Sequence, residues 1–237
     1  MVRRTKEEAQ VTRSRILDAA EHVFERHGVS GTSLNDIAEA AGVTRGAIYW
    51  HFRDKADLFN AMMERVTLPL EESSRIGGAK SAALDIAQMR CSFIDVLHKI
   101  VADAQLKRVF GIATHKVEYV GELTAVRERH IDARDACLVD VERTFKRALR
   151  HGELARGTST RAAAIGLHAL FDGLLQNWML DPRGFDLVQV GTKVLDTYLA
   201  GLARPAVATQ APHTPKHTPT PTRPSGLPVE TSRSLTS

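Results

Sequence analysis

The chain has 237 residues, 43% of them hydrophobic, which is enough to bury a core in one or two domains. Its net charge of +4 does not argue for DNA binding, because residues 1–65 hold ten Lys and Arg against ten Asp and Glu, while residues 204–237 hold four against one. No apolar run approaches the ~18 residues of a membrane span and no secretory leader opens the chain, so we expect a soluble, cytoplasmic protein.

The first predicted helix covers residues 7–27. Its apolar residues recur at helical spacing and are Ile16, Ala19, Ala20, Val23 and Phe24. Gly28 follows and can take the left-handed conformation that ends a helix. Arg3, Arg4 and Lys6 form a short basic arm before this helix, which we expect to be mobile in isolation.

Two short helices joined by a tight turn are predicted next. Ser33 can cap the first of them, and Asp36 lies near the positive end of the helix dipole. Gly42 ends that helix, and the Thr44 hydroxyl can cap a second helix over residues 45–52. This spacing predicts a helix-turn-helix.

The second of these helices leaves a polar and aromatic face uncovered, formed by Thr44, Arg45, Gly46, Tyr49, Trp50 and His51. Such a face offers a forked donor for guanine edges, groups that bind phosphate, and a glycine that permits close approach to a groove. No acidic residue occurs between Glu39 and Asp54, so no negative charge would repel a DNA backbone there. The sequence therefore predicts a recognition helix for double-stranded DNA.

The run Gly42-Val43-Thr44-Arg45-Gly46-Ala47-Ile48-Tyr49-Trp50-His51-Phe52, followed by Lys55 and Leu58, resembles the DNA-binding signature of TetR-family transcriptional repressors. More narrowly, residues 2–9 and His115-Lys116-Val117-Glu118 resemble multidrug-efflux repressors of the AcrR and TtgR type, with similarity over about residues 2–203. The resemblance implies phosphate contacts by His51 and Lys55. The expected DNA contacts are Thr32, Ser33, Thr44, Arg45, Gly46, Tyr49, Trp50, His51 and Lys55.

A fourth predicted helix begins after Asp54, which can cap it, with Asp57 as the acid three residues later. Pro69 either bends this helix or stops it near Leu68, because an internal proline costs ~3 kcal/mol. Gly77-Gly78 marks the boundary that follows. We expect this helix to connect the DNA reader to a sensor.

Five further helices are predicted over residues 81–101, 103–116, 123–150, 159–180 and 186–203. The first of these is apolar on more than one face, which is typical of a buried central helix. No alternating β-type pattern occurs, so the predicted fold class is all-α with about nine helices.

Three regions follow from this pattern. We expect an N-terminal arm and helix-turn-helix domain at residues 1–53, and a ligand-binding and dimerisation domain at residues 54–203. Residues 204–237 are rich in Pro and Thr without apolar periodicity, and we expect them to form a disordered tail.

The last two predicted helices carry more apolar surface than one intramolecular contact requires. Their apolar residues are Leu167, Phe171, Leu174, Leu175 and Trp178, then Leu187, Val188, Val194, Leu195, Tyr198, Leu199 and Leu202. A homodimer through a four-helix contact would bury this surface and give the reader the two-fold symmetry of a palindromic operator. A wider intramolecular core is the alternative.

An efflux-type repressor needs a roomy, mostly apolar cavity with a few polar groups that orient a ligand. The resemblance to TtgR-type repressors places His115 and Asp172 at pocket-lining positions. The expected ligand contacts are Met89, Phe93, Phe110, His115, Glu118, His168, Asp172 and Trp178. Each polar member has an alternative role in an internal hydrogen bond or salt bridge.

We expect no cofactor and no metal. Cys91 and Cys137 lack CxxC spacing and are predicted to be buried free thiols, and His213 and His217 of the tail are weak ligands on an unstructured segment. A metal-dependent helical-bundle enzyme is the remote alternative, but no HExxH, GxSxG or glycine-rich phosphate loop supports it.

The sequence thus predicts a repressor that binds a palindromic operator as a dimer and is released by a small apolar or amphipathic effector, controlling a multidrug efflux operon. Two other regulators with the same fold stay open: one of lipid or amino-acid metabolism, and an activator.

Overall fold

The computed structural model of the chain describes residues 6–74 and 85–203. Three predictions concern residues outside these ranges: the basic Arg3 and Arg4, the Gly77-Gly78 boundary, and the 204–237 tail. Within them every regular element is a helix, apart from an isolated bridge between Leu154 and Ala203, so the all-α prediction is confirmed. No described helix is long and apolar enough to cross a membrane.

Three helices form the first part of the fold: α1 (Lys6–His27), α2 (Leu34–Ala40) and α3 (Arg45–His51). Ser33 caps α2 as predicted, because its Oγ accepts from Asp36 N at 3.2 Å and its own N donates to the Asp36 carboxylate at 2.8 Å. The Ser33 backbone donor holds the pKa of Asp36 below its usual value. Gly42 then turns the chain at φ 62°, and Thr44 Oγ1 accepts from Ala47 N at 3.2 Å to begin α3.

The connecting helix α4 (Lys55–Ser74) begins after Asp54, whose carboxylate accepts from Asp57 N at 2.7 Å. The helix continues through Pro69, so a stop near Leu68 is wrong.

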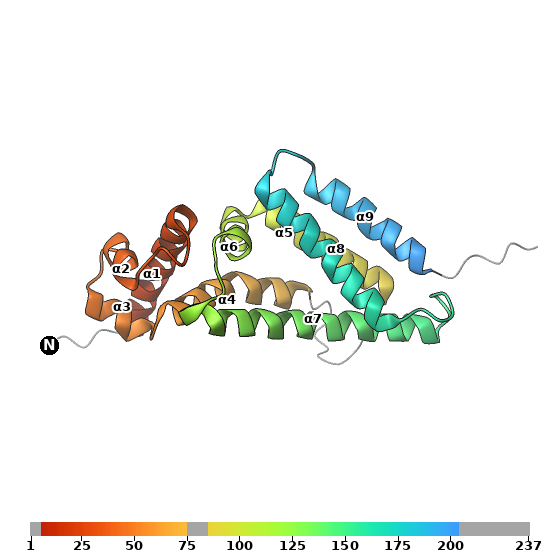
Figure 1. Ribbon diagram of the computed structural model, residues 1–237, viewed down its shortest axis with the longest axis horizontal. Coiled ribbons are helices and arrows are strands. Elements are labelled where there is room, and N and C mark those ends of the chain that lie inside the picture. The colour runs from red at the N-terminus through yellow and green to blue at the C-terminus, as the bar shows by residue number, and fades with distance from the viewer. Residues whose placement is uncertain (1–5, 75–84, 204–237) are drawn as a thin grey trace, which may run out of the picture. The chain divides into compact units, whose positions relative to one another are not determined.

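The remaining helices are α5 (Ile86–Ala102), α6 (Ala104–His115), α7 (Thr124–Arg150), α8 (Thr160–Leu180) and α9 (Leu187–Leu202), with a 3₁₀ turn η1 (Gly121–Leu123) before α7. In Figure 1, α4 and α7 run side by side, α8 and α9 cross above α7, and α6 stands between α1 and α8. Helix α6 therefore contacts both the helix-turn-helix region and the C-terminal bundle.

Helix α5 differs from its prediction in both start and burial. Asp85 is extended and caps the helix by accepting from Gln88 N at 2.7 Å, so the helix begins at Ile86 and not at residue 81. Its fully buried residues are Met89, Leu97 and Ile100, while Val101 is exposed. The second apolar face of α5 is only half-covered, because its neighbours surround part of its circumference.

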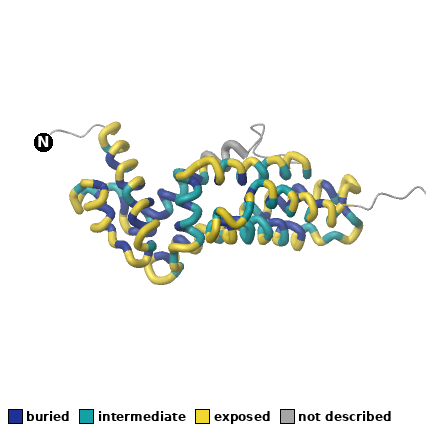
Figure 2. The backbone as a smooth tube through the Cα atoms, turned by 90° about the horizontal axis from the view of Figure 1, so that it is seen from above, coloured by how far each residue is buried: buried dark blue, intermediate teal, exposed yellow. Residues whose placement is uncertain are grey.

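The buried residues of the described chain form two hydrophobic clusters. Figure 2 marks the buried stretches of each helix. One cluster runs from Ile16 of α1 through Phe59 of α4 to Trp178 of α8, and the other joins Phe145 of α7 to Leu195 of α9. The core therefore continues from the helix-turn-helix region into the bundle. The predicted domain boundary after residue 53 is not marked by a break in packing and stays a prediction.

Helix α9 lies close to both α5 and α8. Tyr198 of α9 donates to Ala163 O of α8 at 2.7 Å, across Gly166, where an added Cβ would collide with the phenol. Arg90 of α5 donates to Asp196 of α9 at 2.9 Å. This bonding fixes α9 as the closing element of the bundle.

Candidate nucleic-acid interface and ligand site

The outward face of α3 is an exposed group of side chains with few internal partners. The Arg45 guanidinium lies 5.8 Å from the centroid of the Tyr49 ring, one helical turn further on. Trp50 is 73% exposed, and its ring stands edge-on to His51 at 4.6 Å. An added Cβ on Gly46 would meet no protein atom within 4 Å. The helix therefore presents a cation, aromatic surface and an uncovered stretch of backbone.

Ser33 and Thr44 lie exposed at the N-termini of α2 and α3, in agreement with their predicted position on this surface. At the start of α2 the Ser33 amide already bonds to the Asp36 carboxylate, and at the start of α3 the Ala47 amide bonds to Thr44 Oγ1. Arg15 was missed by the sequence reasoning: its guanidinium donates to Ala41 O at 2.6 Å and so fixes the turn between these helices. An isolated arginine on α1 gives no signal of that partner.

Two predicted DNA contacts are placed otherwise by the structure. Lys55 is only 6% exposed, and its ammonium donates to Thr32 O at 2.9 Å and pairs with Glu122 of η1 at 2.7 Å. The Thr32 side chain is buried and donates to Gly28 O at 2.7 Å. Both side chains are occupied inside the protein, so in this structure Lys55 links α4 to η1 and is not an exposed phosphate contact.

The apolar ligand candidates do not converge on one place. Met89 is buried in the second core cluster and Trp178 in the first, where the Lys107 ammonium lies 4.7 Å from the Trp178 ring centroid. Phe93 of α5 packs edge-on against Phe171 of α8 at 5.1 Å, and both are half-buried. Phe110 of α6 is half-buried against the first cluster.

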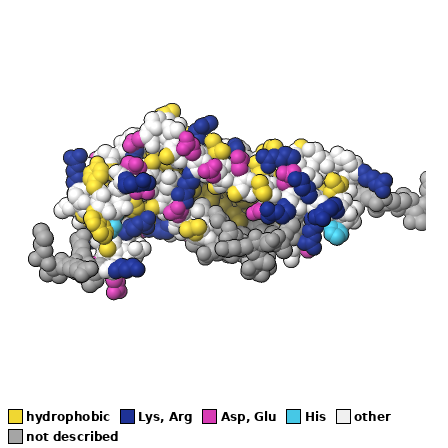
Figure 3. Space-filling view, turned by 90° about the horizontal axis from the view of Figure 1, so that it is seen from below, with side chains coloured by type: hydrophobic (Ala, Val, Ile, Leu, Met, Phe, Trp, Pro, Cys, Tyr) yellow, Lys and Arg dark blue, Asp and Glu magenta, His cyan; other side chains and the backbone are white. Residues whose placement is uncertain are grey.

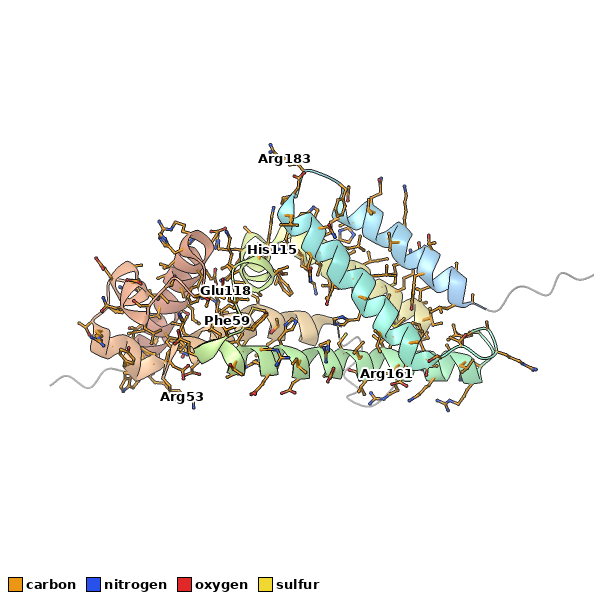
Figure 4. The ribbon with its side chains drawn as sticks, viewed as in Figure 1. Arg53, Phe59, His115, Glu118, Arg161 and Arg183 are labelled. Atoms are coloured by element: carbon orange, nitrogen blue, oxygen red, sulfur yellow. The ribbon has the colours of Figure 1, made fainter. Side chains whose placement is uncertain are left out.

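The polar candidates fall into two separate groups. His115 and Glu118, at the end of α6 and just beyond it, are exposed (Figure 4). His115 Nε2 lies 3.1 Å from Gln176 O of α8. On α8 itself, His168 Nδ1 lies 3.1 Å from the Asp172 carboxylate, and that carboxylate side chain is 45% exposed. Asp172 is therefore half of a semi-exposed pair within one helix.

The surface of the described residues is hollowed in at least two places. Hydrophobic side chains lie at the bottom of a hollow in the middle of the face shown in Figure 3. A polar depression of about 230 Å³ lies where α5 begins and α7 ends, lined by Asp85, Ile86, Thr144, Arg147, Ala148, His151 and Glu153. None of the predicted ligand contacts lines this depression.

The described residues hold no group of three or more His, Cys, Asp or Glu side chains that could bind a metal ion. Cys137 is half-buried, and burial raises the pKa of its thiol to about 11. Cys91 is exposed on α5, so the prediction that it is buried is wrong. It lies on the side of the helix that no described neighbour covers.

Comparison with known proteins covers both parts of this fold. The family described as bacterial regulatory proteins, tetR family, matches residues 16–62, from the middle of α1 through α2 and α3 into α4. The C-terminal region of the MAATS-type transcriptional repressors matches residues 85–203.

The chain is 38% identical over 199 residues to the HTH-type transcriptional regulator TtgR of Pseudomonas putida, covering 84% of this chain and 95% of TtgR. NalD, the secondary repressor of the MexAB-OprM multidrug efflux pump in Pseudomonas aeruginosa, is 35% identical with a TM-score of 0.76, covering 85% of this chain and 100% of NalD. SmeT in complex with triclosan is 31% identical with a TM-score of 0.72, covering 90% and 100%; SmeT represses the Stenotrophomonas maltophilia pump SmeDEF. The chain therefore belongs to the TetR family of bacterial transcriptional regulators, with the C-terminal region of the MAATS-type repressors.

Proposed function

We propose that this protein is a homodimeric repressor of a multidrug efflux operon, which leaves its palindromic operator when a small, mostly apolar effector binds. The outward face of α3 carries the proposal, because Arg45, Gly46 and Trp50 are exposed there and lie outside both hydrophobic clusters of the described residues. The efflux assignment is supported by the similarity to NalD and SmeT, which are both repressors of such pumps.

On DNA, Arg45 is the base-reading residue of this interface. Its forked donors suit the O6 and N7 acceptors of guanine in the major groove, and the Tyr49 ring restricts the directions that the guanidinium can take. Tyr49, Trp50 and His51 then follow the sugar–phosphate backbone, together with the capped starts of α2 and α3. Since residues 1–65 carry no net charge, affinity depends on these placed contacts more than on bulk attraction.

Dimerisation would use the apolar surface that α8 and α9 leave uncovered. Ile165 and Leu180 of α8 are exposed, and Val190 and Val194 of α9 are half-exposed outside both core clusters. Pairing α8 and α9 with the same helices of a second copy covers this surface and creates a two-fold axis. That axis would set two recognition helices one turn of DNA apart.

The effector would occupy the apolar hollow of Figure 3. Half-buried aromatic residues of the bundle, such as Phe93 and Phe171, are suited to apolar compounds, and the triclosan complex of SmeT is a precedent in a relative. An effector that prefers the non-binding conformer by ~1 to 3 kcal/mol would lower operator occupancy 5- to 150-fold.

The test of the reader uses a duplex that the protein selects from a random pool. Arg45→Ala should lose ~1 to 3 kcal/mol on this duplex and clearly less on random DNA. Arg26→Ala is the matched control, because Arg26 is exposed at the end of α1 and bonds to His22 O. Equal losses on both DNAs would make Arg45 a phosphate contact and refute its role as the reader.

Two further measurements test the assembly and its release. Analytical sedimentation should show a dimer of the unaltered chain and a monomer of Ile165→Asp. If the unaltered chain were a monomer and still bound the full palindrome, the proposed dimer would be wrong. Triclosan, used as the probe, should release the selected duplex at saturation. Failure of triclosan and a panel of other apolar biocides would favour an effector of metabolic origin.

A further inference from the structure

Glu21 of α1 is a buried carboxylate that DNA reading does not use. Its side chain is 2% exposed, and its partners come from two other helices. Arg65 of α4 pairs with it, Gln105 Nε2 of α6 donates to its Oε1 at 2.8 Å, and Arg108 of α6 donates to its Oε2 at 3.3 Å. One carboxylate therefore joins the first helix of the reader to both the connecting helix and α6.

Two exposed acids flank this junction on the same face of α1. Asp18 accepts from Arg65 Nη1 at 2.7 Å, and Glu25 pairs with Arg108 at 3.3 Å. Among the described residues the buried Arg65 Nε has no hydrogen-bond partner, while the other two nitrogens of this guanidinium bond to Asp18 and Glu21. Without the Glu21 charge, both arginines would keep only a solvent-exposed partner on α1.

The opposite side of α6 is bonded to the sensor. Lys107 lies over the Trp178 ring, and His115 Nε2 lies 3.1 Å from Gln176 O of α8. Helix α6 is thus held on one side by α8 and on the other by Glu21. Any displacement of α6 relative to α8 must pass into α1 or break the bonds to Glu21.

The reader is attached to this region at a second point. Val29 N, just after α1, donates to Lys116 O at the end of α6 at 2.8 Å, and Lys55 pairs with Glu122. One attachment by itself would permit rotation of the reader about it. Two attachments, one at Glu21 and one between Val29 N and Lys116 O, fix the orientation of α1 on α6.

We propose that Glu21 is the positioning residue that couples α6 to the DNA-binding helices, through its junction with Arg65, Gln105 and Arg108. The proposal rests on the proposed function, since it explains how an event in the sensor reaches α3. Binding is reciprocal between coupled sites, so DNA bound at α3 must also stabilise α6 through the same junction. This reciprocity allows a test without the natural effector.

The test compares Glu21→Gln, which keeps the shape and removes the charge, with Asp18→Asn and Glu25→Gln as controls on the same face. Amide hydrogen exchange of α6 is measured with and without the selected duplex, well below each melting temperature. In the unaltered protein, DNA should slow exchange in both α3 and α6. In Glu21→Gln at saturating DNA, the protection of α3 should remain and that of α6 should vanish, with affinity at least about fivefold lower. The DNA affinity of the two controls should stay within about twofold of that of the unaltered protein, because exposed ion pairs contribute little to stability.

A purely structural role predicts a different pattern: Glu21→Gln would melt lower, yet DNA would still protect α6. That result would overturn the proposal, and so would the absence of α6 protection in the unaltered protein. If Glu21→Gln does not fold, Gln105→Met is used in its place, because it removes one bond to the same carboxylate and keeps both arginine pairs. Gln105→Met should weaken the protection of α6 by DNA, while Asp18→Asn should bind DNA as tightly as the unaltered protein. Failure of effectors to release DNA would count against the proposed function only, because this measurement contains no effector.

Discussion

Gly46→Ala separates what α3 needs for folding from what it needs for DNA. Glycine within a helix is less stable than alanine by roughly 0.5–1 kcal/mol, and an added Cβ at Gly46 meets no protein atom within 4 Å. Gly46 is the second residue of α3, so we expect the lower end of this range. With about 2–4 °C per kcal/mol for a chain of this size, the variant should melt about 1–2 °C higher.

DNA affinity should change in the opposite direction. The methyl group would stand on the outward face next to Arg45, where the backbone must approach the groove, and a displaced recognition helix loses its base contacts. We expect a loss of ~1 to 3 kcal/mol on the selected duplex, which is about 5- to 150-fold. Calorimetric melting and fluorescence anisotropy with labelled duplex measure the two effects separately.

Gly111→Ala in α6 is the control for this variant, because an added Cβ there would lie 3.9 Å from Met179 Sδ of α8, which is an ordinary van der Waals distance. It should raise the melting temperature to a similar extent and leave DNA affinity unchanged. A Gly46→Ala variant that melts higher and binds the duplex as tightly as before would refute the reasoning, since no close approach would then occur at Gly46.

Three further predictions concern residues that the structure places differently from the sequence-based expectation. Lys55→Met should lower the free energy of unfolding by ~1 to 3 kcal/mol, because Thr32 O and Glu122 lose a charged donor. It should leave the salt dependence of DNA binding unchanged. If the slope of log affinity against log salt concentration fell by about one, Lys55 would be a phosphate contact. Asp172→Asn should lower the free energy of unfolding by less than ~1 kcal/mol, because its pair with His168 is semi-exposed. A loss of several kcal/mol in thermal unfolding would reveal a buried partner. At pH 8 a thiol reagent should label the exposed Cys91 rapidly and Cys137 slowly. The pKa of about 11 keeps the Cys137 thiol protonated until the pH approaches that value. Equal labelling rates would contradict the burial of Cys137.

The sequence predicted best those features whose partners are near in the chain. The Ser33 cap, the Gly42 turn and the Thr44 cap each depend on residues within one helical turn, so their pattern is readable without tertiary structure. The helix boundaries from α6 to α9 follow from the same local signals, such as the caps at Asp103 and Ser159.

The features that were missed have partners far along the chain. Lys55 looks like a surface cation until Glu122 and Thr32 O are brought to it by folding. Glu21 carried a local signal, because it interrupts the apolar stripe between Leu17 and Phe24, but nothing nearby identifies Arg65 and Arg108 as its partners. An acid on an apolar stripe therefore predicts burial with a partner, and only the fold supplies the partner.

The ligand contacts were the least predictable part. Periodicity placed Met89, Phe93, Phe110 and Trp178 on apolar faces, but it does not distinguish a residue that fills the core from one that borders a hollow. Met89 and Trp178 are buried in different clusters, whereas Phe93 and Phe110 are half-buried. That distinction depends on how completely neighbouring helices cover each face, and coverage is a property of the assembled bundle.

The position of α9 as the closing element of the bundle also orders events during synthesis. Its bond from Arg90 to Asp196 joins residues 106 positions apart, and at roughly 5–20 residues per second the second partner is made roughly 5–20 s after the first. The reader helices α1 to α3 need no such wait for their own contacts. The nascent protein therefore carries an apolar α5 that still lacks its last neighbour, and the chain is exposed to aggregation during this interval.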